Sequence, residues 1–433
     1  MRGTRRWVIA AAAVGLLLRL AFGLFYWTHE PLTHDEREYL ALARSLVRGE
    51  GLHYPADEPA PGTGQQFGRA PGYPAFLALL HVSHPVEHVP ARVKIAQSIV
   101  GACGILLIAA IARRLAGDRA AVCAAIVAAI YPPLAWTPAY ALSETLYSTV
   151  ALAAAWTLAK AARPAPAAAI ARSVVTAAVL TALAILIRPA ILLFVPLAAA
   201  WLWALPQRRA ARNAVAFVAI TVCCLLPWTI RNYRTYGRWI LVASEGGVTF
   251  WTGNHPLATG EGDLATNPAL KAAEIEFRRS HAPMTPERLE PLYYRDAFRW
   301  IRENPAAWIR LELRKLFFTI VPVGPSYAVH SARYRIASAG SYLLLLPFAA
   351  AGAWRLRTRA AARSERAEPA GVEADGAAAV PLWLMAAATI VAGLVFFPQE
   401  RFRIPVVDPA LIVAAAALAG VRTHERISRR SHV

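Results

Sequence analysis

Two short segments of the sequence contain carboxylates that could take a proton from a substrate. Asp35 and Glu36 follow Thr33, and Glu144 follows Ser143. A carboxylate next to a hydroxyl-bearing substrate can act as a general base. Each acid also has a structural alternative, because Thr33 and Glu36 have the spacing of a capping box and Ser143 can cap a helix that starts at Glu144. We take Asp35 as the strongest candidate base, since the capping box does not require it, and keep Glu36 and Glu144 in the candidate catalytic set.

Arginines recur at separate turns of the sequence and inside one apolar run. A guanidinium group binds phosphate through two parallel hydrogen bonds, so arginines that converge predict an anionic site, with phosphate as the expected anion. Any single arginine has a structural alternative, because its charged end can reach the lipid headgroups. The candidates for binding a phosphate are Arg188, Arg231, Arg401, Arg403 and, within the first apolar run, Arg19.

Four further residues lie near these groups and are candidates for positioning a substrate: Tyr39, Tyr73, Asn254 and Glu400. The run RAPGYP from Arg69 contains Tyr73, and we expect it to form a rigid turn rather than to contact a ligand directly. The histidines of the same region, including His34, show no recognised spacing of metal ligands, so no residue is assigned to a metal.

The composition identifies the setting in which these residues act. The chain has 433 residues, of which 57% are hydrophobic and 17% are charged, with a net charge of +19. A soluble chain normally carries about 25% charged residues, and several apolar runs here are long enough to cross a bilayer. We therefore predict an all-α polytopic membrane protein. Its basic charge is explained by Lys and Arg on the cytoplasmic side, so nucleic acid is not expected as a partner.

Hydropathy and charge together predict about ten transmembrane helices. With the N-terminus inside, the basic clusters fall on the cytoplasmic side, including those at 113–119, 208–212, 355–366 and 422–430. Two larger segments, 28–94 and 231–336, then lie outside, and residues 306–324 are expected to form an interfacial helix on the outer surface. The spans are expected near residues 7–27, 95–112, 120–137, 143–159, 173–187, 190–205, 214–230, 337–354, 379–397 and 404–420.

This arrangement predicts three parts. Residues 1–230 would form an N-terminal transmembrane catalytic module, residues 231–336 an extracytoplasmic loop region, and residues 337–433 a C-terminal transmembrane module. Long loops in a compact protein usually carry function, so the working face is expected outside. The segment 364–378 is expected to be a cytoplasmic connector.

In order along the chain, these motifs resemble the GT-C fold family of glycosyltransferases that use lipid-linked sugars. The resemblance is to the bacterial branch that contains the protein O-mannosyltransferase-like and aminoarabinose-transferase-like enzymes. Each motif is weak alone, but the series covers nearly the whole chain. The matching runs are residues 35–51, RAPGYPAFLALL from Arg69, SETLY from Ser143, IRPAILLFVPL from Ile187, RNYRTYGRW from Arg231, GGVTFWTGN from Gly246, IRENPAAWIRLELRK from Ile301 and QERFRIP from Gln399.

The resemblance implies a sugar donor on a polyprenyl phosphate and an acceptor outside the cytoplasm. It implies that Asp35 is the catalytic base and that Glu144 matches a second acid that helps to position donor or acceptor. Single displacement by the acceptor would invert the anomeric centre. The expected location is the bacterial inner membrane, with membrane lipids around the chain. No nucleotide cofactor is expected, and a divalent cation is left open.

Three other classes remain as alternatives. A transporter or lipid flippase would place polar groups near the bilayer midplane, whereas the charges here lie at the ends of the spans. A non-catalytic membrane scaffold would use the acids only as helix caps. An O-antigen ligase or polymerase is closer in chemistry but has different loop motifs. The sequence specifies neither the sugar, nor the acceptor, nor the oligomeric state.

Overall fold

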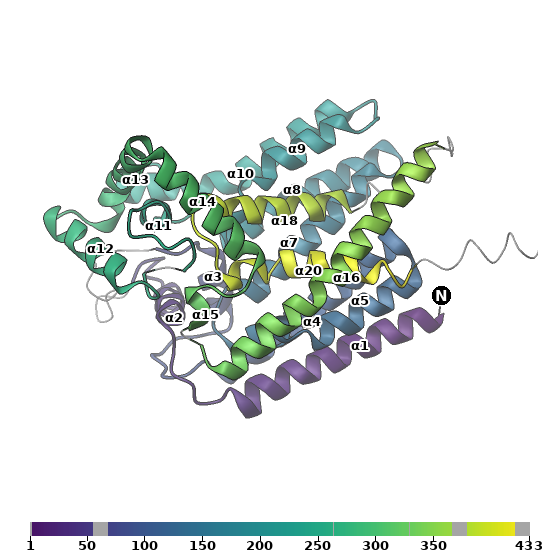
Figure 1. The fold of residues 1–433 in the computed structure, drawn as a ribbon, viewed down its shortest axis with the longest axis horizontal. Coiled ribbons are helices and arrows are strands. Elements are labelled where there is room, and N and C mark those ends of the chain that lie inside the picture. Colours follow the sequence, from purple (N-terminus) through teal and green to yellow (C-terminus); the bar gives the residue numbers. More distant parts are fainter. Residues whose placement is uncertain (1, 55–67, 263, 329, 366–378, 421–433) are drawn as a thin grey trace, which may run out of the picture.

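The computed structural model describes residues 2–54, 68–262, 264–328, 330–365 and 379–420. These residues form helices and connecting segments, with no β-strand among them. The helices make an elongated bundle (Figure 1). The N-terminus lies at one end of the bundle, and α2 (His34–Val47), α11 (Gly246–Gly253), α12 (Pro268–Ser280) and α13 (Pro286–Glu303) gather at the opposite end.

A helix lies at each of the ten positions where a span is expected. Five helical segments are individually long and apolar enough to cross a membrane, or six if a bent pair counts as one span, and three further apolar helices are shorter. The chain is therefore a multi-pass membrane protein, while the number ten stays a prediction. The ten helices are α1 (Arg2–Ala21), α4 (Ala91–Ala116), α5 (Asp118–Ile130), α7 (Glu144–Leu158), α8 (Ala167–Ile187), α9 (Phe194–Ala204), α10 (Ala210–Tyr236), α16 (Ala332–Glu365), α18 (Val380–Val395) and α20 (Val407–Ala416).

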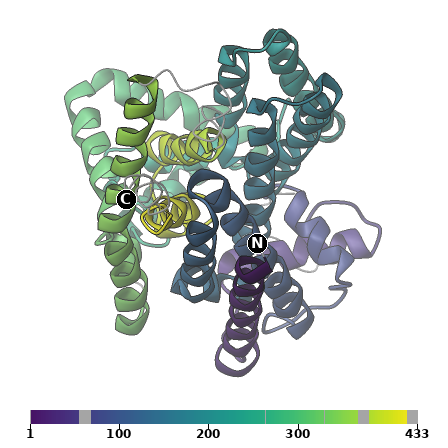
Figure 2. The same ribbon diagram turned by 90° about the vertical axis from the view of Figure 1, so that its right-hand side faces the viewer.

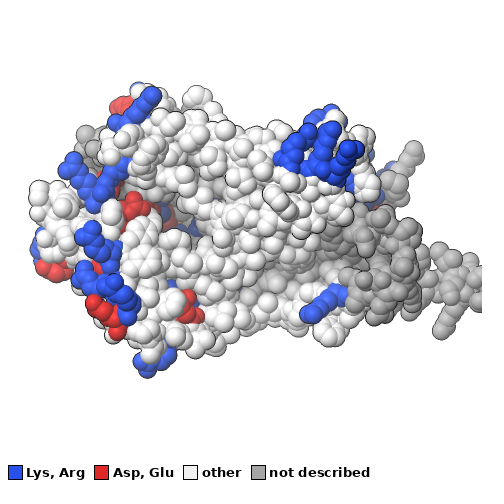
Figure 3. Space-filling model, turned by 90° about the horizontal axis from the view of Figure 1, so that it is seen from above, with Lys and Arg blue, Asp and Glu red and all other residues white. Residues whose placement is uncertain are grey.

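Charged side chains gather towards the two ends of the molecule on the face that Figure 3 presents, with a wide uncharged band between them. This distribution suits a bundle whose middle lies in hydrocarbon. At the N-terminal end, the start of α1 meets the turn between α4 and α5, where the Thr4 hydroxyl donates to Asp118 over 3.3 Å. The connector at 366–378 and the basic residues at 422–430 lie outside the described residues.

The bundle packs largely through alanine. On α5, a stripe of fully or almost fully buried alanines that includes Ala120, Ala124 and Ala128 faces α1 and α4. Small residues let membrane helices approach closely, since lipid supplies no hydrophobic drive between them. The C-terminal helices α18 and α20 run through the middle of the bundle (Figure 2). There α20 contacts α5 and α16, and α18 contacts α7 and α9. The segment between α18 and α20 is therefore held inside the bundle.

The end opposite the N-terminus contains the helices of the two predicted outer segments. In the first of these segments, α2 starts with the complete capping box of Thr33 and Glu36 whose spacing the sequence shows. The 231–336 region builds a small core of its own around Phe250, Trp251 and Tyr293. The helix α14 (Pro305–Ile320) occupies most of the segment expected at the interface and packs beside α18; it is not among the helices long and apolar enough to span.

Short helices join these elements. After α5 the chain bends by 64° at a break that precedes α6 (Pro132–Trp136) and the 3₁₀ turn η2 (Thr137–Ala139). Proline cannot donate the hydrogen bond that would continue a helix, so Pro132 and Pro133 account for the break. The other short elements are the π-helical turn η1 (Phe22–Tyr26), α3 (Gly72–Leu79), the 3₁₀ turns η3 (Ala159–Ala162) and η4 (Pro189–Ile191), α15 (Pro325–Ala328) and α19 (Glu400–Arg403).

Candidate active site

Asp35 lies between two arginines that come from distant parts of the chain. It occupies the first turn of α2, whose start is fixed by its capping box and which lies at the end of the bundle opposite the N-terminus. Arg69 Nη2 donates to Asp35 Oδ1 over 2.6 Å, and Arg401 Nη1 donates to Asp35 Oδ2 over 2.5 Å. Both carboxylate oxygens of Asp35 therefore hold a guanidinium group, and Arg401, one of the arginines that the sequence selected, lies on the candidate base.

Arg69 links several acids to Asp35. Its Nε donates to Glu38 over 2.7 Å, and its Nη1 lies 3.3 Å from Glu245 Oε2. Its guanidinium also lies over the ring of Tyr39, 5.5 Å from the centroid. Sequence analysis missed this role, because it assigned the RAPGYP run to a rigid turn. The available signal was a cation directly before that turn, within the first predicted outer segment.

Glu144 forms a second acid and arginine pair close to the first. Arg188 Nη1 lies 2.8 Å from Glu144 Oε1, and Ser143 does not cap the helix that Glu144 begins. The ring of Phe402 connects the two pairs, since the guanidinium of Arg188 lies 4.7 Å from its centroid and that of Arg401 lies 5.5 Å from it. The structure thus brings together Asp35, Glu144, Arg188 and Arg401 from four separate segments.

Tyr39 also belongs to this cluster. Its ring is buried on the side of α2 that faces the bundle, and its hydroxyl donates to Ser143 Oγ over 3.4 Å. It therefore lies between the Arg69 cluster and the turn that carries Glu144. Its role in positioning a substrate stays a prediction.

The charges of the cluster set the protonation states of its acids. Burial alone would raise the pKa of Asp35, but the charges of Arg401 and Arg69 outweigh it and hold that pKa well below its usual range. Burial raises the pKa of Glu245 to about 7, against the opposing effect of Arg69. Asp35 is therefore ionised at neutral pH, while Glu245 exchanges a proton near neutrality.

Glu36 has a structural role in the fold, and its place in the candidate catalytic set stays a prediction. Its Oε2 accepts hydrogen bonds from the backbone N–H and the hydroxyl of Thr33, both over 2.8 Å, and its Oε1 accepts the backbone N–H of Ala141 over 2.9 Å. Both oxygens are committed, and the side chain is buried. The capping box that the sequence offered for this acid is formed, and the bond to Ala141 also ties α2 to the turn before Glu144.

Two other predicted phosphate ligands lie away from Asp35 and have their own partners. Arg231 donates to the Leu52 carbonyl over 3.1 Å. Arg403 donates to Asp408 over 3.1 Å, and its guanidinium lies 3.5 Å from the centroid of the Tyr342 ring. Because α19 is a single turn, Arg401 and Arg403 leave it in different directions, and Arg403 anchors the turn that presents Arg401.

The remaining positioning candidates are likewise bound within the fold. The Tyr73 hydroxyl donates to Gln97 over 3.0 Å. The Asn254 amide donates to the Phe250 and Val395 carbonyls, both over 2.9 Å, and its oxygen accepts from Trp308 and Lys315. Glu400 is buried beside Arg403, and burial raises its pKa to about 7 despite that arginine. None of the three is brought onto Asp35.

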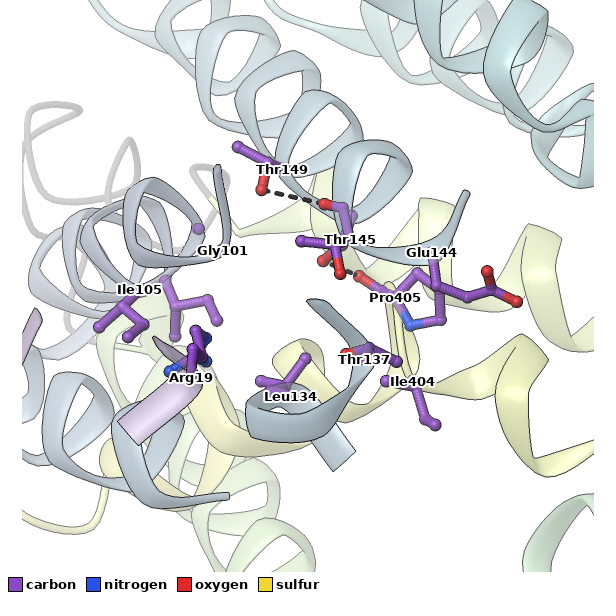
Figure 4. A pocket seen from close by; sticks show the side chains of 13 residues that line it. Arg19, Gly101, Ile105, Leu134, Thr137, Glu144, Thr145, Thr149, Ile404 and Pro405 are labelled. Atoms are coloured by element: carbon purple, nitrogen blue, oxygen red, sulfur yellow. Dashed lines mark hydrogen bonds between the residues drawn. The ribbon is translucent and has the colours of Figure 1, made fainter. Parts of the chain in front are cut away.

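A cavity of about 20 Å³ lies among α1, α4, α6 and α7, next to this cluster. Figure 4 shows Arg19 and Glu144 on its wall, with the Glu144 carboxylate directed away from Arg19. The terminal nitrogens of Arg19 bind the carbonyls of Gly15, Ala128 and Ala129 over 2.8–3.3 Å. Arg19 is buried in the bundle interior, and its terminal nitrogens are committed to backbone carbonyls.

Three side chains of α2 could offer ligand atoms to a metal ion. One atom each from His34, Asp35 and Glu38 lies within 4.8 Å of the others. However, Arg69 binds both Asp35 and Glu38, and Arg401 holds the second Asp35 oxygen. A divalent cation would have to displace two guanidinium groups from these carboxylates, so the donor set as arranged does not fit a resident metal.

Comparison with known proteins gives the fold. Residues 69–230 match the family model described as dolichyl-phosphate-mannose-protein mannosyltransferase. No curated protein sequence is significantly similar to the chain. The archaeal oligosaccharyltransferase AglB from Archaeoglobus fulgidus, solved with an inhibitory peptide and a dolichol-phosphate, superposes with a TM-score of 0.54 at 15% identity, over 99% of this chain and 52% of that one.

Two other solved structures are similar. The Archaeoglobus fulgidus oligosaccharyltransferase tethered to an acceptor peptide containing the NVT sequon gives a TM-score of 0.56 at 14% identity, over 98% of this chain and 51% of that one. ArnT from Cupriavidus metallidurans, bound to undecaprenyl phosphate, gives a TM-score of 0.42 at 14% identity, over 90% of this chain and 77% of that one. The chain spans about half the length of the oligosaccharyltransferases. It has the GT-C fold, as the sequence predicted.

Proposed function

We propose that the protein is a membrane glycosyltransferase that moves a sugar from a polyprenyl-phosphate donor to an extracytoplasmic acceptor. The observation that carries this proposal is Asp35, held at 2.5–2.6 Å between Arg401 and Arg69 at the end of the bundle. A base and two phosphate-binding cations in contact are the groups that such a transfer requires. The GT-C fold and the family match over residues 69–230 support the same reading.

In the proposed reaction, Asp35 takes the proton of the acceptor hydroxyl while the acceptor oxygen attacks the anomeric carbon. The bond between that carbon and the phosphate oxygen breaks, and its electron pair stays on the phosphate. The products are a glycosylated acceptor of inverted configuration and a polyprenyl phosphate. The phosphate already leaves readily, so the paired acid and base of glycosidases are not needed.

The arginines serve the phosphate as its charge grows. A donor phosphodiester carries one negative charge, and the departing monoester carries up to two, so cations aimed at it stabilise the transition state more than the ground state. Arg401, Arg69 and Arg188 are the proposed ligands, since all three lie within the cluster that contains Asp35 and Glu144. Arg231, Arg403 and Arg19 are assigned to the scaffold instead.

The same arginines regulate the base. With both oxygens of Asp35 bound to guanidinium groups, its pKa is low and the carboxylate is a weak base. A donor phosphate that draws Arg401 or Arg69 towards itself would free one oxygen of Asp35 and raise its proton affinity. Binding of the donor would therefore prepare the base for the acceptor, and the resting enzyme would be protected from wasteful hydrolysis.

The proposed location is the bacterial inner membrane, with the site on the outer side and membrane lipids around the bundle. The donor class is supported by the AglB structure, which contains a dolichol-phosphate and a peptide. The proposed acceptor is a hydroxyl or phosphate group of lipid A, a glycan, a protein or a lipid. We propose the same three parts as the sequence predicts. Residues 1–230 form the N-terminal transmembrane catalytic module, residues 231–336 the extracytoplasmic loop region, and residues 337–433 the C-terminal transmembrane module, which supplies Arg401.

The proposal is tested with the purified full chain in liposomes, supplied with radiolabelled sugars on polyprenyl phosphate and with envelope fractions as acceptors. Transfer of label by the wild type but not by Asp35→Asn supports it. Equal transfer by both chains would remove Asp35 as the base. Movement of an intact lipid-linked sugar across the liposome membrane without transfer would favour the flippase instead.

A further inference from the structure

The break between α5 and α6 leaves two backbone carbonyls without their helical partners. In a continuous helix, the Ala128 carbonyl would accept the N–H of residue 132 and the Ala129 carbonyl that of residue 133. Both positions are proline, which has no N–H. Unpaired carbonyls are costly in the interior of a membrane protein, where water cannot replace the missing donors.

Arg19 supplies the missing donors. Its Nη2 donates to the Ala128 carbonyl over 3.2 Å, and its Nη1 donates to the Ala129 carbonyl over 3.3 Å. One side chain of α1 thus replaces the two N–H groups that Pro132 and Pro133 lack. The position at the C-terminal end of α5 also suits a cation, because the helix dipole is negative there.

The surrounding helices leave a slot for this side chain. A Cβ added to Gly101 would lie 3.1 Å from Arg19 Nε, and one added to Gly15 would lie 3.0 Å from Nη1 and 2.4 Å from Ile105 Cδ1. In Figure 4, Arg19 lies between Gly101 and Ile105 of α4 and Leu134 of α6. Arg19 is 2% exposed, and no carboxylate in the described part of the chain pairs with it. Its hydrogen-bond partners are backbone carbonyls, and its side chain lines the cavity.

The segment after the break carries the outer turn of the proposed site. Gln97 Nε2 donates to the Pro138 and Tyr140 carbonyls over 3.1 and 2.6 Å. The Ala141 N–H donates to Glu36, which holds the start of α2. Glu144 follows three residues later and pairs with Arg188. The direction in which the chain leaves the break therefore decides where this acid meets the Asp35 cluster.

We propose that Arg19 is an intramembrane positioning residue. It stabilises the broken span and so fixes the outer turn at 138–143 that presents Glu144 to Arg188. The effect on sugar transfer rests on the proposed function, whereas the effect on the outer turn does not. A bent span is required here, because a straight continuation of α5 would carry residues 138–143 along a different axis.

The test compares four variants of the full chain in lipid nanodiscs. Arg19→Met removes both donors. Arg19→Met with Pro132→Ala and Pro133→Ala returns the two backbone N–H groups that Arg19 replaces. Arg114→Met without and with the same two proline changes is the matched control pair, because Arg114 also binds a backbone carbonyl, that of Trp156 over 3.0 Å, but on α4.

Three properties are measured. The first is the melting temperature. The second is the rate at which Ala141→Cys, introduced into each chain, reacts with a membrane-impermeant maleimide, corrected for the parent chain; Ala141 is fully buried in the folded protein. The third is kcat/KM for transfer. The labelling rate reports the outer turn even if the chain transfers no sugar.

We expect Arg19→Met to melt at a lower temperature, to label faster and to lose transfer on the order of 100-fold, the cost of a misplacement of about 1 Å. The triple variant should regain its melting temperature, because the carbonyls are paired again, yet still label fast and transfer poorly. The Arg114 control should gain no melting temperature from the proline changes.

Two results would overturn the proposal. If the triple variant melts no higher than Arg19→Met, Arg19 does not replace the proline N–H groups. If labelling and transfer return to wild-type values together with the melting temperature, Arg19 only stabilises the fold and does not position the turn. A wild type that transfers no sugar would refute the proposed function alone, since melting and labelling would still decide the role of Arg19.

Discussion

Asp35 and Arg401 are 366 residues apart in the chain, and an oxygen of one lies 2.5 Å from a nitrogen of the other. Asp35 belongs to α2, and Arg401 to the single turn between α18 and α20. The contact exists because α18 and α20 insert into the middle of the bundle. The candidate site therefore needs both ends of the chain, and neither predicted transmembrane module forms it alone.

Replacement of the candidate base should separate chemistry from binding. We expect Asp35→Asn to lower kcat by about 10²–10⁴-fold, the usual contribution of a general base. Its affinity for polyprenyl phosphate should be equal to or higher than that of the wild type, because the variant no longer competes as strongly for Arg401 and Arg69. Transfer kinetics measure the first effect. Titration of the protein in nanodiscs with a fluorescent polyprenyl phosphate measures the second.

The matched control for this variant is Asp118→Asn. Asp118 pairs with Arg113 over 2.7 Å, but at the N-terminal end of the bundle. It should leave kcat and lipid affinity unchanged. Weaker lipid binding by Asp35→Asn would contradict the proposed competition between Asp35 and phosphate.

The two arginines of α19 should differ in effect. We expect Arg401→Ala to weaken binding of polyprenyl phosphate by about 10- to 100-fold, the loss of a charge-assisted pair, with little change in melting temperature. Arg401→Lys should recover only part of the affinity, because lysine cannot form the bidentate contact. Lipid titration and thermal melting of the same preparations provide the measurement.

Arg403→Met should show the opposite pattern. It removes the ion pair of the buried Asp408, which keeps only the hydrogen bond from the Tyr131 hydroxyl, so we expect a clear fall in melting temperature. At a temperature where the variant is folded, its lipid affinity should remain closer to that of the wild type than the affinity of Arg401→Ala. An equal loss of affinity in both variants would return Arg403 to the phosphate site.

The pKa of Glu245 predicts a pH-dependent stability. Burial raises it to about 7 from an ordinary value of 4.5. Between these values the folded chain holds a proton that the unfolded chain has released, so stability falls as pH rises through this window. Glu245→Gln lacks this loss, and its melting temperature relative to the wild type should rise from pH 5 to pH 8. Exposed Glu276→Gln, the control, should show a constant difference; an equally constant difference for Glu245→Gln would contradict the assignment.

Removal of divalent metal should leave transfer intact. The carboxylates of Asp35 and Glu38, which could bind a cation with His34, are already neutralised by Arg69 and Arg401. We therefore expect the same kcat/KM after dialysis against EDTA as before it, and no loss in His34→Ala. Inactivation by EDTA that Mg²⁺ or Mn²⁺ reverses would show that a metal displaces the arginines during the reaction.

Glu36 should matter for folding rather than for chemistry. Its carboxylate accepts three hydrogen bonds from Thr33 and Ala141. We expect Glu36→Gln to cost about 1–3 kcal/mol of stability, typical of a buried polar partner lost from a charged group, and to retain much of the kcat of the folded fraction. Thermal melting and active-site titration separate the two quantities. A loss of kcat as large as that of Asp35→Asn would keep Glu36 in the catalytic set.

The sequence alone determined the membrane class, the helical segments and the order of the motifs. These follow from local properties: apolar runs form helices in lipid because no other structure pairs every backbone group, and a Thr and a Glu three residues apart form a capping box wherever a helix starts. Asp35, Glu144, Arg188 and Arg401 could also be selected, since each is a charge that the predicted spans place on the outer side, where the positive-inside rule does not require it.

The tertiary structure decided which of the selected charges meet. Arg401 and Arg403 lie two residues apart and are chemically identical, yet one binds Asp35 and the other binds Asp408, because a single helical turn directs them to different neighbours. The role of Arg69 could not be predicted, because its motif indicated only a turn. Arg19 could not be assigned from its own segment, because its partners are carbonyls exposed by prolines more than 100 residues away. Hydropathy gives the free energy of placing a residue in the membrane. Which partner the residue meets there depends on how the helices pack.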